Sequence, residues 1–482
     1  MKMYIGGQER VASDGKVIEV INPAMGEIID TAPEASRADV DEALTNGIKG
    51  QKEWYKVPIH KRAEILTKFV SLAMAEENRK PMSLVLCKEM GKPLKEAYGD
   101  FNILKAHFDG FITAARNNLT GVVLPINAEP GKEKDFDFTI REPIGTILCI
   151  LAFNAPLTLF AKKVAPALLT GNSVIVKPAS DDPLTVLMLS KLMLEAGVPG
   201  NAYQVVTGGG NTVGNWLTQD PRIAGVTFTG STAVGVKIAE NVARNCKYQS
   251  LELGGNAPLI ICEDADIDLA VQEAMSGRAT YLSGQICSVA KRFIVQRSKK
   301  DEFVAKLVSG VSKIKVGDPM DPDTQMGTLI SEKAAKEVER QVNMTIEQGA
   351  KLVFGGKRNG AYYGPTVLDN VFKGMDIAHD MEVFGPVFPI MVFDTIEEAI
   401  EMANDTKYGL GSGIMTKDMK IAMKAALELK AGNVVINGQT FYRNLLTPFG
   451  GCKMSGIGRE GQTATLLAMT QIKNIVFKGI LP

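Results

Sequence analysis

The spacing of apolar residues changes near Ile144 and divides the chain into regions of different predicted structure. Before that residue, two extended segments at residues 4–11 and 17–24 are followed by helical spacing from about Ser36 to Gly110. Ser36 is suited to cap the first helix, because its hydroxyl oxygen can accept a hydrogen bond from a free backbone N–H group. The N-terminal region is therefore predicted to form an extended ribbon followed by helices.

From Ile144 onward, short apolar runs rich in β-branched residues alternate with amphipathic helical segments. The runs of the first series are residues 145–152, 172–179, 202–208 and 225–230. A second series follows residues 251–261 and comprises residues 292–298, 351–357, 409–415 and 431–438, with a helix expected from Lys300, so a second domain is expected to begin near Gly254. Such alternation is typical of βαβ units on parallel sheets, so we predict an α/β protein with two such domains.

Two further segments look like strands outside these domains. Residues 121–142 are strand-like, with a turn at Pro130-Gly131, and residues 470–478 near the C-terminus are also strand-like. Strands that flank a globular domain leave edges on which a second chain can pair. We expect these segments to pair between subunits.

The composition is that of an ordinary globular chain. Its 482 residues correspond to about three domains at roughly 150 residues each. Lysine plus arginine total 54, as do aspartate plus glutamate. This balance argues against nucleic acid and membrane surfaces as partners and favours a small-molecule substrate.

One uncharged stretch, residues 143–161, is long enough to be considered as a membrane span. Gly145, Asn154 and Pro156 interrupt it, and two lysines end it. We interpret it as a buried strand that leads into a helix. The first residues lack the apolar region of a signal peptide, so a cytoplasmic location is expected.

The six cysteines and three histidines show no metal-binding pattern. The cysteines have no CxxC spacing, and the histidines form no HExxH motif. Neither a zinc site nor a disulfide framework is indicated, and we expect no metal. No histidine lies beside a cysteine in the sequence, which weakens the hypothesis of a histidine-activated nucleophile.

Glycine-rich segments give a weak indication of a nucleotide site. Residues 207–214 fail the GxGxxG spacing, and residues 230–237 lack the Gly-Lys-Ser/Thr ending of a P-loop. However, Gly230 and Ser231 lie between a predicted strand and a predicted helix. A helix N-terminus at this point would suit a pyrophosphate, whereas a plain glycine turn is the alternative.

Several motifs taken together are far more specific. They are FNAPL with Asn154, FTGST, LELGGNAP with Glu252, GQICS with Cys287, EVFGPV with Glu382 and Phe384, and PFGGCKMSGIGRE at residues 448–460. In order and spacing these motifs resemble those of the aldehyde dehydrogenase superfamily, and the resemblance spans essentially the whole chain. It implies a Rossmann-like cofactor domain, an α/β catalytic domain and a small β oligomerisation unit.

The resemblance also implies domain boundaries and an assembly. The NAD(P)-binding domain is expected at residues 1–119 and 141–253, and the catalytic domain at residues 254–465. The oligomerisation unit is expected at residues 120–140 and 466–482, joining a homodimer or homotetramer.

The chemistry of aldehyde oxidation fits three of these residues. A thiolate is the best side-chain nucleophile for a carbonyl, and Cys287 is the candidate. The oxyanion that forms needs donors, for which the Asn154 side chain and, as the family implies, the Cys287 backbone N–H are suited. Glu252 between Leu251 and Leu253 is expected to have a raised pKa and to activate water for thioester hydrolysis. Gly254-Gly255 would allow close backbone approach.

Cofactor contacts follow from the resemblance. Lys177 is expected to hold the adenosine ribose, Ser231 the pyrophosphate and Glu382 the nicotinamide ribose, with Phe384 near the nicotinamide. The motif residues Thr229, Gly230 and Leu253 are assigned to the same site.

Ser180 bears on the choice between NAD and NADP. Relatives that prefer NAD often carry glutamate at this place, which binds ribose hydroxyls and repels a 2′-phosphate. A serine removes that repulsion, so NADP is allowed and is plausible as the cofactor.

The substrate is indicated by Arg443 and Lys162, which we expect near the substrate entrance. An arginine fork suits a carboxylate, phosphonate, sulfonate or hydroxyl group at the far end of the aldehyde. For Lys162, a solvated side chain is the alternative. Ala155 stands where relatives that handle larger apolar aldehydes often have an aromatic residue. We therefore predict a short polar or anionic aldehyde of the lactaldehyde or semialdehyde type.

Three alternatives stay open. The enzyme could oxidise a broad range of aliphatic or aromatic aldehydes, pass the acyl group to coenzyme A, or be catalytically silent. CoA-acylating relatives typically lack the glutamate, and silent homologues would be expected to lose Cys287 or Glu252. Both residues are present here.

Overall fold

The computed structural model describes residues 1–125 and 129–482. The N-terminal region forms β1 (Met3–Ile5), β2 (Gln8–Arg10), β3 (Val17–Ile21), β4 (Ile28–Pro33), α1 (Arg37–Tyr55), α2 (Ile59–Met74), α3 (Glu76–Met90) and α4 (Leu94–Asn118). The predicted cap of α1 is confirmed, because Ser36 Oγ accepts from the Asp39 N–H and the Asp39 carboxylate accepts from the Ser36 N–H. The ribbon and the helices predicted for this region are thus present.

The first large sheet has eight strands in the order β2-β1-β8-β7-β6-β9-β10-β20. Its parallel part contains β6 (Thr146–Ile150), β7 (Ser173–Lys177), β8 (Tyr203–Val205), β9 (Gly225–Thr229) and β10 (Tyr248–Glu252). The connecting helices are α5 (Pro156–Leu169), α6 (Leu184–Ala196), α7 (Asn215–Gln219) and α8 (Thr232–Ala243). This is the Rossmann-like arrangement that the first series of apolar runs predicted.

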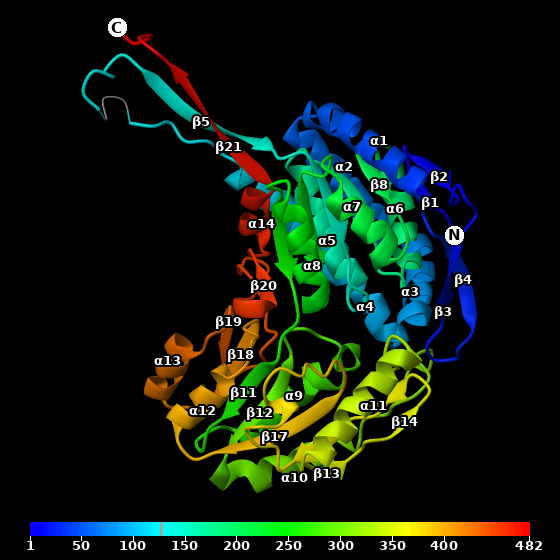
Figure 1. Ribbon diagram of the computed structural model, residues 1–482, viewed down its shortest axis with the longest axis vertical. Coiled ribbons are helices and arrows are strands. Elements are labelled where there is room, and N and C mark those ends of the chain that lie inside the picture. The colour runs from blue at the N-terminus through cyan, green and yellow to red at the C-terminus, as the bar shows by residue number, and fades with distance from the viewer. Residues whose placement is uncertain (126–128) are drawn as a thin grey trace.

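The second large sheet has seven strands in the order β13-β16-β17-β12-β11-β18-β19. They are β11 (Ala257–Ile261), β12 (Ala290–Gln296), β13 (Lys351–Phe354), β16 (Thr366–Asp369), β17 (Val387–Phe393), β18 (Gly411–Met415) and β19 (Asn433–Ile436). Its helices are α9 (Ile267–Arg278), α10 (Lys300–Val311), α11 (Glu332–Glu347), α12 (Ile396–Asn404) and α13 (Met419–Glu428). Figure 1 shows the two sheets as separate lobes, so the predicted α/β class is confirmed.

The C-terminal part of the chain returns to the first lobe. Strand β20 (Gly456–Ile457) pairs with β10, and α14 (Gln462–Ala468) follows it. Strand β21 (Thr470–Phe477) then pairs antiparallel with β5 (Phe136–Pro143), and Figure 1 shows this ribbon extending away from both lobes. The strands predicted at 121–142 and 470–478 are confirmed for these parts, while residues 126–128 lie outside the described chain. Pairing between subunits stays a prediction.

The uncharged stretch at residues 143–161 is buried as predicted. It forms β6 and the first turns of α5, and both elements lie within the core. The two lysines that follow do not end the helix, because α5 continues to Leu169 and buries both Lys162 and Lys163. No helix in the described part of the chain is long and apolar enough to cross a membrane.

Candidate active site

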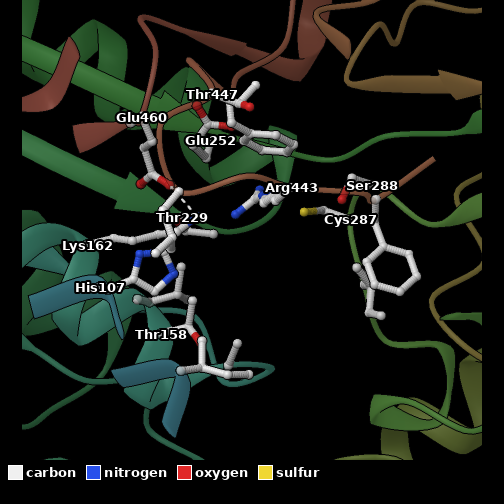
Figure 2. A pocket seen from close by; sticks show the side chains of 18 of the residues that line it. His107, Thr158, Lys162, Thr229, Glu252, Cys287, Ser288, Arg443, Thr447 and Glu460 are labelled. Atoms are coloured by element: carbon white, nitrogen blue, oxygen red, sulfur yellow. Dashed lines mark ion pairs between the residues drawn. The ribbon is translucent and has the colours of Figure 1, made fainter. Parts of the chain in front are cut away.

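A cavity of about 410 Å³ collects side chains from distant parts of the chain. Helices α4 and α5 contribute His107 and Lys162, the end of β10 contributes Glu252, and loops contribute Cys287 and Arg443. Figure 2 shows Arg443 reaching into the cavity on the side where Glu252 and Cys287 lie. Asn154, Glu252 and Cys287, which were predicted from separate motifs, therefore share one cavity. The predicted substrate residues Lys162 and Arg443 line it too.

Cys287 lies in the loop between α9 and β12 and opens onto the cavity. Burial raises the pKa of its thiol, and the positive charges of Arg443 and Lys291 oppose that rise. The Asn154 amide Nδ2 donates to the Gln285 carbonyl, two residues before the cysteine, at 2.9 Å. Asn154 is thereby held beside the nucleophile loop, as a donor to an oxyanion must be.

Glu252 at the end of β10 is only 3% exposed. Among the residues that the structure describes, neither of its carboxylate oxygens has a hydrogen-bond partner. Burial and the neighbouring Glu460 carboxylate raise its pKa, although Arg443 and the lysines of α5 oppose the shift. The predicted rise is thus present, and its cause includes a charge from a distant segment as well as apolar surroundings.

The predicted close approach at Gly254-Gly255 is confirmed. A Cβ at Gly254 would collide with the Glu382 carboxylate, and one at Gly255 would lie 2.8 Å from the Cys287 carbonyl oxygen. Side chains at these two positions would push the nucleophile loop and Glu382 away from the end of β10.

Lys162 and Arg443 form the cationic side of the cavity. Lys162 is 6% exposed and its ammonium lies 3.5 Å from the Glu460 carboxylate, so the solvated alternative was wrong for this residue. Burial, with the Arg443 charge, lowers the pKa of Lys162 to about 8. The Arg443 guanidinium lies 3.2 Å from the centre of the Phe449 ring, which orients it towards the cavity.

The sequence reading missed four residues at the site: His107, Lys163, Lys291 and Glu460. The Lys163 ammonium donates to the Glu460 carboxylate at 2.8 Å. Burial alone would raise the pKa of Glu460, but the charges of Lys163 and Lys162 outweigh burial and lower it. The signal for Glu460 was its place at the end of the motif at 448–460. For His107 no local signal exists. Burial and the nearby cations lower its pKa to about 3, so the imidazole is neutral.

The residues predicted to hold the adenosine ribose and the pyrophosphate of a dinucleotide lie at or just after the carboxyl ends of strands in the first sheet. Lys177 ends β7, is buried, and donates to the Pro178 carbonyl at 3.2 Å. Ser180 Oγ donates to the Gly208 carbonyl at 3.1 Å. Ser231 is the N-cap residue of α8, as predicted, and its hydroxyl makes no cap hydrogen bond. A free hydroxyl at the N-terminus of a twelve-residue helix fits a pyrophosphate.

The turn from β9 to α8 lies against the end of β10. Gly230 N–H donates to the Glu252 carbonyl at 3.0 Å, and the Thr229 hydroxyl is buried without a partner among the described residues. Leu253 is buried directly after Glu252. The three motif residues therefore surround the backbone that carries the carboxylate.

Glu382 and Phe384 lie near the nucleophile. The Glu382 carboxylate Oε1 accepts from Lys291 and from the Gly255 N–H, each at 3.1 Å. The Phe384 and Phe153 rings are packed edge to face with their centres 5.9 Å apart, and Phe153 directly precedes Asn154. The Lys291 ammonium that pairs with Glu382 also donates to the Cys287 carbonyl, so Glu382 lies close to the loop of Cys287.

The fold and the site are those of a nicotinamide-dependent oxidoreductase. The family model named aldehyde dehydrogenase family matches residues 10–475. This chain belongs to the aldehyde dehydrogenase family.

Relatives with different substrates are similarly close to this chain. It is 37% identical over 482 residues to betaine aldehyde dehydrogenase of Cereibacter sphaeroides, covering 99% of this chain and 97% of the relative. It is 35% identical to 3-sulfolactaldehyde dehydrogenase of Pseudomonas putida, covering 99% and 97%. The structure of succinate-semialdehyde dehydrogenase from Burkholderia pseudomallei matches with a TM-score of 0.95 at 35% identity, covering 99% and 98%.

Solved relatives hold both forms of the cofactor. Glyceraldehyde-3-phosphate dehydrogenase of Methanocaldococcus jannaschii, complexed with NADP, matches with a TM-score of 0.90 at 35% identity, covering 96% of this chain and 99% of that one. A betaine aldehyde dehydrogenase of Staphylococcus aureus, in complex with NAD+, matches with a TM-score of 0.94 at 33% identity, covering 100% and 96%. The cofactor is thus NAD or NADP, as predicted.

Proposed function

We propose that this enzyme oxidises a short polar or anionic aldehyde to its carboxylic acid through a covalent adduct on Cys287. The observation that carries the proposal is the content of one cavity. The Cys287 thiol lies there with the Glu252 carboxylate, which has no hydrogen-bond partner among the described residues. Two cations line the same cavity, Arg443 and Lys162, and the second is paired with Glu460. The thiol and the carboxylate supply the chemistry, and Arg443 supplies attraction for an anionic group.

The first chemical step belongs to Cys287. Its thiolate attacks the aldehyde carbon, a C–S bond forms, and the carbonyl oxygen becomes an oxyanion between Asn154 Nδ2 and the Cys287 N–H. When bound, the nicotinamide supplies the acceptor for the hydride. Asn154 and the loop of Cys287 keep the adduct in place, and a thioester on the sulfur is the product of this stage.

Glu252 completes the reaction. Its carboxylate takes a proton from a water molecule, the water oxygen attacks the thioester carbon, and the C–S bond breaks to release the acid, after which the Cys287 thiolate takes the proton from Glu252. A buried carboxylate with free oxygens is suited to this task, because no hydrogen bond has to be broken first. The same carboxylate disfavours a CoA-acylating reaction.

Lys162 is paired with Glu460, so Arg443 is the cation that favours an anionic substrate over a cationic one. Betaine aldehyde carries a quaternary ammonium group, which Arg443 would repel. Sulfolactaldehyde and succinate semialdehyde carry anions that Arg443 would attract. We therefore place this enzyme with the second kind of relative, although the first is slightly more similar in sequence, at 37% against 35% identity.

A broad aliphatic or aromatic specificity is the second candidate. Apolar side chains such as Phe111, Leu159 and Phe441 line part of the same cavity. A panel of succinate semialdehyde, lactaldehyde, sulfolactaldehyde, betaine aldehyde, hexanal and benzaldehyde with both cofactors separates the candidates. A burst of NAD(P)H with acid as product excludes the silent and CoA-acylating alternatives.

Arg443→Ala is expected to lower kcat/KM for the anionic aldehydes by about 10- to 100-fold, because a hydrogen bond to a charged group contributes about 1.5–3 kcal/mol. Because loss of the Arg443 charge also lets the pKa of the Cys287 thiol rise, benzaldehyde should lose activity as well, but several-fold less than the anionic aldehydes. Steady-state kinetics on the panel measure both, and Arg443→Lys, which keeps the charge, serves as the matched control. An equal loss on all substrates, or hexanal as the best substrate of the wild type, would contradict the anion site.

Ser180→Glu is expected to move cofactor preference towards NAD by about tenfold or more, because the new carboxylate repels the 2′-phosphate of NADP. The ratio of kcat/KM for the two cofactors measures the shift. Ser180→Gln introduces a side chain of the same size as glutamate but without its charge. It should therefore change the ratio of kcat/KM for the two cofactors much less. A wild type that strongly prefers NAD, with no effect of the glutamate, would show that Ser180 does not face the 2′ position.

A further inference from the structure

Lys291 is a buried cation directly behind the nucleophile loop. It is the second residue of β12 and is 1% exposed. Its ammonium donates to the carbonyl of Ile286 at 2.8 Å and to that of Cys287 at 2.5 Å, and it pairs with Glu382 at 3.1 Å. All three hydrogens of the ammonium are therefore used. Two of the three acceptors belong to the backbone of the nucleophile and its predecessor.

The bond to Ile286 has a geometric consequence for the Cys287 N–H. The Ile286 carbonyl and the Cys287 N–H belong to one peptide group, which is planar and trans, so they point in opposite directions. An ammonium that holds the carbonyl on one side thereby aims the N–H to the other. Within residues 1–125 and 129–482 the Cys287 N–H donates to no acceptor. It is therefore free to donate to an oxyanion.

We propose that Lys291 is a positioning residue for the oxyanion site, acting through the peptide group between Ile286 and Cys287. The inference rests on the proposed role of Cys287 as nucleophile. Without the ammonium, this peptide group would be free to turn, and the donor beside the sulfur would be lost. Because the same ammonium pairs with Glu382, the peptide group is also tied to a carboxylate expected to hold the nicotinamide ribose.

The neighbouring Arg292 offers a comparison. It is also fully buried, and among the residues that the structure describes it donates only to backbone carbonyls, those of Asn256, Ala378, Met402 and Ala403. None of these carbonyls belongs to the loop of Cys287. Replacing Arg292 tests the loss of a buried cation, whereas replacing Lys291 tests that loss and the release of the peptide group.

Two reagents that need neither aldehyde nor cofactor separate the oxyanion site from the thiolate. p-Nitrophenyl acetate acylates the thiolate: a C–S bond forms, an oxyanion develops on the carbonyl, and p-nitrophenolate leaves. Iodoacetamide alkylates the same sulfur with departure of iodide and no oxyanion. The ratio of the two second-order rate constants, measured against pH on the full chain, therefore reports on the oxyanion donors alone.

In Lys291→Met, acylation is expected to fall about 10- to 100-fold more than alkylation, towards the loss seen when one oxyanion donor is removed. Lys291→Arg should recover part of the ratio, and Arg292→Met, which also removes a buried cation, should leave it unchanged. The double variant Lys291→Met with Glu382→Gln leaves no unpaired charge and is measured alongside, so that the test does not depend on the folding of one variant.

An unchanged ratio in Lys291→Met, with a reactive wild type, overturns the role of Lys291. The same holds if acylation and alkylation fall together, because Lys291 would then act on the thiolate only. A wild-type Cys287 that reacts with neither reagent would instead refute its assignment as the nucleophile. The two failures are thus distinguishable.

Discussion

Cys287→Ala is expected to lower aldehyde oxidation by at least about 10⁴-fold, because removing the nucleophile of a covalent mechanism removes the adduct from which hydride leaves. Alanine fits where the thiol lies, so the fold and cofactor binding should survive. NAD(P)H formation measures the loss, and thermal unfolding with cofactor titration checks the rest.

Cys246→Ala is the matched control for this substitution. Cys246 is an exposed free cysteine that follows α8 and lies outside the cavity. Its replacement should leave turnover within about twofold of the wild type. Retained turnover in Cys287→Ala would show that another group carries the chemistry.

Glu252→Gln is expected to slow thioester hydrolysis by about 10²- to 10⁴-fold, the range for loss of a general base. Formation of the thioester should be much less affected. Stopped-flow measurement should therefore show a burst of NAD(P)H close to one equivalent, followed by a slow steady state. Loss of the burst as well would show that Glu252 also activates the Cys287 thiol.

The pH dependence of hydrolysis follows from the raised pKa of Glu252. Only the ionised carboxylate can take a proton from water, so the rate should rise with pH until it passes that raised value. In Glu252→Gln this rise should disappear. A profile governed by an ordinary carboxyl, flat from about pH 5 upward, would contradict the raised pKa.

Burial of this carboxyl also affects stability. Because the folded chain holds the Glu252 proton more tightly than the unfolded chain, this residue lowers the free energy of unfolding as pH rises from its unfolded to its folded pKa. Thermal melts of Glu252→Gln above pH 7 should therefore show no loss of stability relative to the wild type. A large loss would mean that the carboxylate has a structural partner.

Periodicity in the sequence predicted most of the elements but could not assign every run to a sheet. Every residue of the run 251–261 is buried, including the polar Glu252 and Asn256, yet β10 ends at Glu252 in the first sheet and β11 begins at Ala257 in the second. Both halves are buried, so their hydrophobicity carries no sign of the division. Gly254 and Gly255, where the chain crosses, were the only local indication.

Charged residues were harder to place than apolar ones. Lys162 and Lys163 looked like the exposed end of an apolar stretch, but α5 buries both. Their partner, Glu460, lies 297 residues beyond Lys163. A charged side chain is stable in the interior only when an opposite charge or several hydrogen-bond partners meet it, and nothing near the two lysines in the sequence indicates that partner.

The sequence by itself determined the alternation of strands and helices and the candidates for the reacting groups, because both depend on local patterns. Asn154, Glu252 and Cys287 each stand in a motif that can be read without the fold. Only the tertiary structure decided which charges surround them, and it placed His107 and Lys291 close to these residues. Desolvation and Coulomb interactions act through space, so the pKa values and the direction of a peptide N–H depend on neighbours that the order of residues does not show.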